Sequence, residues 1–130
     1  METTMTTKRD RFLTAARGGT TDRPPVGAWV HYGSARWSPQ QVAEAHLRFY
    51  RDYDWDFIKV MHDYRIDLPD GLDEITDPAQ LDTILADPDT ELESHARQRE
   101  VLRLIRAEAP EAAIIETLFS PCIFYTSPSP

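Results

Sequence analysis

The sequence predicts an α/β fold of about three parallel strands with flanking helices. Three short apolar runs, at residues 25–32, 56–62 and 112–119, have the length and composition of strands. The segments between them are long enough to contain crossover helices. Strands that alternate with helices pair in parallel. Runs that are apolar almost throughout are typical of strands buried on both faces.

The composition is that of a globular chain with an acidic surface. The 130 residues contain 14 Lys and Arg against 22 Asp and Glu, a formal charge of −8. That charge argues against general binding of nucleic acid and against docking on anionic lipid. No run approaches the roughly 20 apolar residues of a membrane helix, and the polar start has no signal-peptide core. The single cysteine, Cys122, excludes an internal disulfide, so we expect a cytoplasmic protein.

The first helix is expected over residues 8–17. Thr7 is a candidate N-cap, and a Gly-Gly pair that begins at Gly18 ends the helical pattern. We expect residues 1–7 to be disordered. The first strand should follow the helix at 25–32.

The second helix has the clearest signals in the chain. Ser38 is a candidate N-cap, Pro39 suits the first helical position, and Gln41 completes a capping box. The residues that follow form one apolar face at helical spacing, and we expect the histidine on it to be packed in the core. This face consists of Val42, Ala45, His46, Phe49, Tyr50 and Tyr53.

The second half of the chain repeats the alternation. A strand is expected at 56–62, a short helix at 77–86 and a third strand at 112–119. A long helix should precede the third strand, with Asp89 or Thr90 as its cap. The clearest core residues of the long helix are Val101, Leu102, Leu104 and Ile105.

Three parallel strands are too few for a stable open sheet, whereas a (β/α)8 barrel takes about 250 residues. The chain has about half that length, so the predicted architecture is a partial TIM (β/α)8 barrel. Residues 8–122 would form the amino-terminal part of the barrel, and 123–130 an irregular tail. Such a piece would leave an open sheet edge, which favours self-association.

Functional groups of parallel α/β folds collect at the carboxyl ends of the strands. The sequence places His31, Arg36, His62, Asp63 and Tyr64 there. We expect Arg36 and Asp63 to lie around one mouth of the partial barrel. The same residues also admit structural roles, since strand-end histidines are often only hydrogen-bonded and an aspartate can cap a turn.

Two charged residues lie within predicted strands. Lys59 interrupts an apolar run, and a buried charge needs a partner. It could pair with Glu116 on the adjacent strand or act in catalysis. A metal site could be assembled from His31, His62, Asp63 and Glu116, although no spacing among them is diagnostic.

Two motifs stand together near the start of the chain. Residues 11–18 read RFLTAARG, and residues 22–26 read DRPPV. This pattern resembles the amino terminus of the uroporphyrinogen decarboxylase superfamily, where a helix of the form RFL-x-A-x-x-G precedes DRPPV and the first barrel strand. The resemblance continues through DFIKVM at 56–61 and covers about residues 8–122.

The resemblance implies a TIM-barrel decarboxylase that acts on an acidic tetrapyrrole without a metal or an organic cofactor. It implies that Asp63 is the catalytic aspartate, which stabilises the protonated pyrrole, and that Arg36 holds a substrate carboxylate. His31, His62 and Tyr64 would line the pocket. His31 stands where the family has the first arginine of its arginine-rich loop.

Two alternatives remain open at this point. The chain also resembles the cobamide-dependent methyltransferase branch of the same superfamily, in which histidine and cysteine residues late in the chain hold zinc. The corresponding positions would lie beyond Pro130. The other alternative is a truncated, non-catalytic remnant or partner-binding piece.

Overall fold

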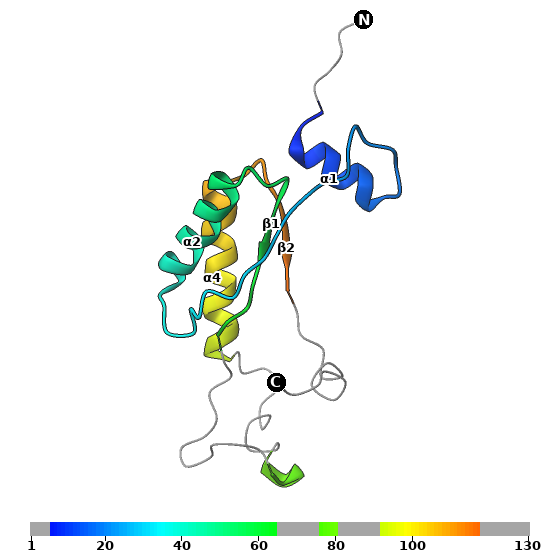
Figure 1. Ribbon diagram of the computed structural model, residues 1–130. Helices are drawn as coiled ribbons and strands as arrows, with labels where there is room; N and C mark the ends of the chain where they lie inside the picture. The colour runs from blue at the N-terminus through cyan, green and yellow to red at the C-terminus, as the bar shows by residue number, and fades with distance from the viewer. Residues whose placement is uncertain (1–5, 65–75, 81–91, 118–130) are drawn as a thin grey trace, which may run out of the picture.

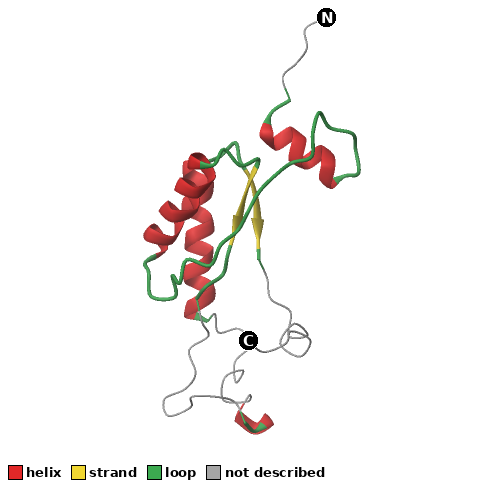
Figure 2. Ribbon diagram, viewed as in Figure 1, coloured by secondary structure: helices red, strands yellow, loops and turns green. Residues whose placement is uncertain are grey.

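The computed structural model describes residues 6–64, 76–80 and 92–117. Figure 1 and Figure 2 show two long helices side by side next to a small sheet, with a shorter helix near the start of the chain. The elements are α1 (Lys8–Ala16), α2 (Pro39–Asp52), β1 (Phe57–Val60), α4 (Glu93–Glu108) and β2 (Ala113–Glu116). Within the remaining described part, residues 78–80 are helical.

The two strands of the described residues form a parallel sheet. Phe57 lies opposite Ala113, and Val60 lies opposite Glu116. Helix α4 lies between the strands in sequence, as the crossover of a parallel pair requires. The mixed α/β class and the parallel pairing predicted for these two strands are therefore confirmed.

The hydrophobic core lies between the sheet and the two long helices. Helix α2 packs against both α4 and β1. The side chains of Val60, Val101 and Ile105 are fully buried there, with Val42 and Ile58 beside them. Burial of such a side chain stabilises the fold by about 1.5–3 kcal/mol.

The predicted caps of the first two helices are confirmed. The Thr7 hydroxyl accepts a hydrogen bond from the Asp10 amide. Ser38 and Gln41 form the complete capping box, with a proline as the first helical residue. Gly18 follows α1 at a φ of +76°, the left-handed conformation that glycine adopts without strain.

The buried face of α2 is broader than the predicted one. Val42, His46 and Tyr50 are buried as expected, but Ala43 and Leu47 are buried as well. These two residues lie toward α4. The spacing of apolar residues in the sequence did not reveal that α2 contacts α4. Tyr53, which was predicted on the apolar face, is the C-cap residue of α2 and is 63% exposed.

Helix α4 begins later than predicted. Its N-cap is Leu92, which makes no side-chain cap hydrogen bond, and its first residue is Glu93. Asp89 and Thr90, the predicted caps, lie outside the described residues. Val101 and Ile105 are fully buried, which confirms them as core positions.

Residues 25–32 were predicted to be the first strand, and that prediction is wrong. The segment belongs to no sheet within the described residues. It does run alongside β1 in the same direction. At one end the Val26 carbonyl accepts a hydrogen bond from the Asp56 amide, and at the other the Tyr32 amide donates to the Asp63 carboxylate.

Two features of this segment explain why no ladder of hydrogen bonds forms. Pro25 has no amide hydrogen to donate. Gly27 lies against the ring of Phe57, so close that a Cβ on Gly27 would be 2.5 Å from the ring. The segment therefore contacts β1 through a side chain at this point, and the sheet formed by the described residues has two strands in place of the expected three.

Several predictions fall on residues outside the described part of the chain. They concern most of the disordered start, most of the short helix at 77–86, the last residues of the third strand and the tail at 123–130. The partial (β/α)8 barrel therefore stays a prediction beyond the two parallel strands.

Candidate functional site

Asp63 lies just beyond the carboxyl end of β1, at the centre of a small hydrogen-bonded group. Its Oδ1 is 2.7 Å from His31 Nδ1. Its Oδ2 accepts hydrogen bonds from the Tyr32 amide at 3.1 Å and from the Ser34 hydroxyl at 3.0 Å. We call these four residues the Asp63 group. It joins the end of the 25–32 segment, and the Gly-Ser break after it, to the end of β1.

The environment keeps Asp63 ionised. Burial favours the neutral acid, but the hydrogen bonds from His31 and Ser34 outweigh it and hold the pKa of Asp63 below its usual value. The fixed negative charge acts on the neighbouring phenol. Burial, followed by the charge of Asp63, raises the pKa of Tyr32 to about 12, so the phenol stays protonated.

His31 is the part of the Asp63 group that faces solvent. Its side chain is 54% exposed, against 9% for the side chain of Asp63. A hydrogen bond from Nδ1 to a carboxylate fixes the ring and leaves Nε2 available to a ligand or a proton. Trp29 packs edge-on against the ring at 5.3 Å between centroids, which further restricts its orientation.

The remaining predicted binding residues occupy different environments. Arg36 is exposed two residues beyond Ser34 and makes no ion pair with any described residue. Tyr64 is buried, and its hydroxyl donates to the Trp37 carbonyl. The guanidinium of Arg97 lies over the Tyr64 ring at 4.4 Å from its centroid. Tyr64 therefore links the loop before α2 to α4.

His62 faces α4, away from the Asp63 group. Its ring lies 5.7 Å from that of His95, between centroids. Burial, with a further contribution from His95, lowers the pKa of His62, so the ring is neutral at pH 7. The structure thus divides the four residues of the predicted metal site: His31 pairs with Asp63, while His62 and Glu116 contact α4. Within the described ranges, no three His, Cys, Asp or Glu side chains form a group that could hold a metal.

The predicted pairing of Lys59 with Glu116 is not formed. Lys59 is paired in register with Ile115, so Glu116 lies on the same face of the sheet as Val60, and Lys59 on the other face. Gln98 donates to the Glu116 carboxylate instead, at 2.9 Å.

His46 is a core residue, as predicted. It is 3% exposed, its Nδ1 lies 2.8 Å from the Val42 carbonyl, and its Nε2 accepts a hydrogen bond from the Met61 amide. Burial lowers the pKa of His46, as this pairing requires, because a protonated ring could not accept from Met61. The neutral ring ties α2 to the end of β1.

A second charged cluster lies at the amino end of β1, and sequence reasoning did not identify it. Asp56 is 1% exposed and accepts hydrogen bonds from the side chains of Arg11 and Arg23 and from the Val26 amide. Arg11 also makes a two-bond ion pair with Asp22. Three of these charges belong to the RFLTAARG and DRPPV motifs, which could have signalled the cluster. The motifs therefore hold α1 against the start of β1, at the opposite end from the Asp63 group.

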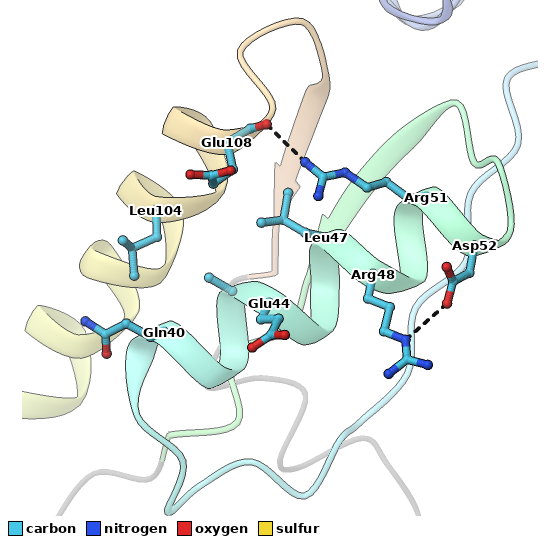
Figure 3. Close-up of a pocket in the computed structure, with 9 residues that line it drawn as sticks. Gln40, Glu44, Leu47, Arg48, Arg51, Asp52, Leu104 and Glu108 are labelled. Carbon is cyan, nitrogen blue, oxygen red and sulfur yellow. Dashed lines mark hydrogen bonds and ion pairs between the residues drawn. The ribbon is translucent and has the colours of Figure 1, made fainter.

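A groove between the outer faces of α2 and α4 has a volume of about 440 Å³. Figure 3 shows Leu47 and Leu104 facing each other across it, with charged side chains around the rim. Arg51 donates to the Glu108 carbonyl across one end of the groove. The other rim charges pair with each other or face solvent, so the groove presents no convergent set of catalytic groups.

None of the helices in the described ranges has the length and hydropathy needed to cross a membrane.

Comparisons with other proteins do not assign the chain to a family. No family model, curated protein or solved structure matches it.

Proposed function

We propose that the chain carries the amino-terminal part of a uroporphyrinogen-decarboxylase-like barrel in the cytoplasm, and that Asp63 stabilises positive charge on an acidic tetrapyrrole during decarboxylation. The observation that supports this best is the Asp63 group. Its carboxylate follows a parallel strand, is oriented by three donors and has a lowered pKa. A preoriented charge of this kind stabilises a cation without having to reorganise during the reaction.

The surroundings of Asp63 suggest how the substrate would be held. The side chain of Asp63 is largely covered, so a substrate would contact the hydrogen-bonded pair of His31 and Asp63 mainly at the exposed ring of His31. Arg36 is exposed and without an ion-pair partner in the described part of the chain, so it is available to bind a substrate carboxylate. In the proposed step, the substrate carboxylate leaves as CO₂ while the protonated pyrrole accepts the electron pair. The Asp63 charge favours that protonated form.

The substitution Asp63→Asn tests the proposal directly. The amide would keep the shape of the side chain but remove the charge, so we expect loss of uroporphyrinogen decarboxylation by the purified chain, or of uroporphyrin binding measured by fluorescence. The matched control is Asp52→Asn, an exposed surface carboxylate on α2. Unchanged turnover and binding in Asp63→Asn would reject the role of Asp63, and a chain without either activity would reject the proposed function.

A partner-binding role is the alternative that a specific observation favours. Val26, Trp29 and Val30 are 50%, 54% and 40% exposed in the segment beside β1. Several exposed apolar side chains in one short segment are typical of an interaction surface. The cobamide-dependent methyltransferase alternative has no comparable support among the described residues.

A further inference from the structure

Four buried polar atoms without partners lie along the first turns of α4. Within the described residues, six buried side-chain nitrogen or oxygen atoms lack a hydrogen-bond partner, and four of these belong to residues of the first turns of α4 or to residues that contact them. They are His62 Nε2, Ser94 Oγ, Gln98 Oε1 and Glu116 Oε2. A buried polar atom without a partner costs about 1–3 kcal/mol, so four in one place point to a ligand.

The contacts around these atoms hold them along one side of α4. Gln98 Nε2 donates to Glu116 Oε1 at 2.9 Å and lies 3.4 Å from the Met61 carbonyl, immediately before His62. Ser94 lies four residues before Gln98, about one helical turn away on the same face. Ser94 and Gln98 are 5% and 4% exposed. The cluster therefore joins the carboxyl ends of both strands to the start of α4.

The four atoms are mainly acceptors. When Glu116 is ionised, its Oε2 carries lone pairs only, and Gln98 Oε1 does so too, because the Gln98 amide nitrogen is the donor. A ring nitrogen of His62 donates a hydrogen bond to the Ser94 backbone, which favours the protonated ring. Since Nε2 has no partner, the donor is Nδ1. In the neutral ring, Nε2 is therefore an acceptor. With Glu116 ionised, only the Ser94 hydroxyl can donate, so the fitting occupant is a cation or a group rich in donors.

We propose that His62, Ser94, Gln98 and Glu116 bind a divalent cation, with the imidazole nitrogen and the carboxylate as principal ligands. The amide and hydroxyl oxygens and solvent complete the coordination. Nitrogen and oxygen ligands in this mixture suit Mn²⁺ and Zn²⁺.

The cation site is separate from the Asp63 group. Glu116 lies on the face of the sheet that Gln98 of α4 contacts, whereas Asp63 binds residues 31, 32 and 34. The proposal goes beyond the proposed decarboxylase function and does not depend on it.

A titration of the purified chain with Mn²⁺, followed by proton NMR of the histidine rings, tests the site. Paramagnetic broadening falls steeply with distance from the ion. We therefore expect the signals of His62 and His95 to broaden first and that of His31 to persist. Broadening of His31 before His62, or equal broadening of all ring signals, would overturn the proposal, because the ion would then bind elsewhere or nonspecifically.

Substitutions connect the binding to the ligands. We expect Glu116→Gln and His62→Gln each to weaken Mn²⁺ binding about tenfold or more, while Glu111→Gln, at an exposed glutamate before β2, leaves it unchanged. Glu116→Gln keeps an acceptor for the Gln98 amide. If Glu116→Gln nevertheless folds poorly, His62→Gln is a second, independent test. Affinity unchanged in both variants would overturn the assignment.

Discussion

Asp56 Oδ1 accepts a 2.7 Å hydrogen bond from Arg11 Nη1, which ties α1 to the residue before β1. The Arg23 guanidinium and the Val26 amide complete the shell of the same buried carboxylate. The hydrogen bonds from Arg23, Val26 and Arg11 outweigh burial and keep the pKa of Asp56 below its usual value. One carboxylate thus fixes the path of the chain from the first helix to the first strand.

Removal of this carboxylate should destabilise the whole fold. Asp56→Ala leaves Arg11 only its ion pair with the half-exposed Asp22 and removes the acceptor of the Val26 amide. A buried donor that loses its partner costs about 1–3 kcal/mol. We expect the urea midpoint to fall accordingly, measured by circular dichroism at pH 7. The difference should shrink in acid, because a carboxylate with a lowered pKa contributes stability above its unfolded pKa and loses that contribution as the pH falls through its folded pKa.

The matched control for this prediction is Asp52→Ala. Asp52 is an exposed aspartate that pairs with Arg48 one turn away on α2. Surface pairs of this kind contribute about 0–1 kcal/mol. Equal effects of the two substitutions would show that the Asp56 cluster does not hold α1 in place.

The close contact of Gly27 with Phe57 gives a second prediction. A Cβ at Gly27 would lie 2.5 Å from the Phe57 ring, which itself packs on Phe12 at 5.0 Å between ring centroids. Gly27→Ala should therefore lower the free energy of unfolding by about 1–3 kcal/mol through overpacking. The double variant Gly27→Ala, Phe57→Leu should recover part of this loss in the same urea titration. The single variant Phe57→Leu is measured as well. If the losses of Gly27→Ala and Phe57→Leu simply add in the double variant, the contact between the two residues does not govern the position of the segment.

The raised pKa of Glu116 predicts a pH-dependent effect. Burial raises this pKa from 4.5 to about 7, so the folded chain binds more protons than the unfolded chain between these values. Stability contributed by Glu116 therefore falls as the pH rises across that window. Glu116→Gln removes the effect and should be nearly neutral at pH 4.5 but stabilising by about 1–3 kcal/mol at pH 8.

Urea unfolding at several pH values in metal-free buffer measures this difference. His46 and His62 have lowered pKa values, so their contributions are lost as the pH falls below about 6.5. Both histidines remain in Glu116→Gln, so the contribution of His46 cancels in the comparison. His62 belongs to the same cluster as Glu116, so the decisive difference is read above pH 6.5, where the His62 ring is neutral in the folded chain. For Glu111→Gln, the difference in free energy of unfolding from the natural chain should not change with pH. If the difference for Glu116→Gln does not change with pH either, the Glu116 carboxyl is not buried enough to titrate near neutrality.

The helix caps that the sequence predicts correctly depend on neighbouring residues. The capping box of Ser38 and Gln41 and the Thr7 cap are formed within three residues, so the local sequence contains all the partners. The strand at 25–32 fails for the opposite reason. Its apolar composition suits a strand, but strand formation requires a second backbone within hydrogen-bonding distance along its length, and Gly27 and Phe57 contact each other there instead.

The candidate site was predictable as a list of residues but not as a set of contacts. Parallel topology places His31 and Asp63 at one end of the sheet, yet their 2.7 Å pairing depends on the path of a segment that is not a strand. Lys59 and Glu116 show the same limit. Their strands are adjacent as predicted, but a difference of one residue in register places the two side chains on opposite faces.

The exposed apolar surface of the 25–32 segment gives the last prediction. Trp29 is 54% exposed in the same segment as the exposed Val26 and Val30, and apolar exposure of this kind favours association of two chains. We expect the purified chain to self-associate at about 100 µM, measured by light scattering after size exclusion, and Trp29→Ser to shift it toward the monomer. Tyr53→Ser is the matched control, because Tyr53 is an aromatic residue of similar exposure at the end of α2. Dissociation by Tyr53→Ser but not by Trp29→Ser would place the contact elsewhere, and a natural chain that is monomeric at this concentration would refute association through the segment.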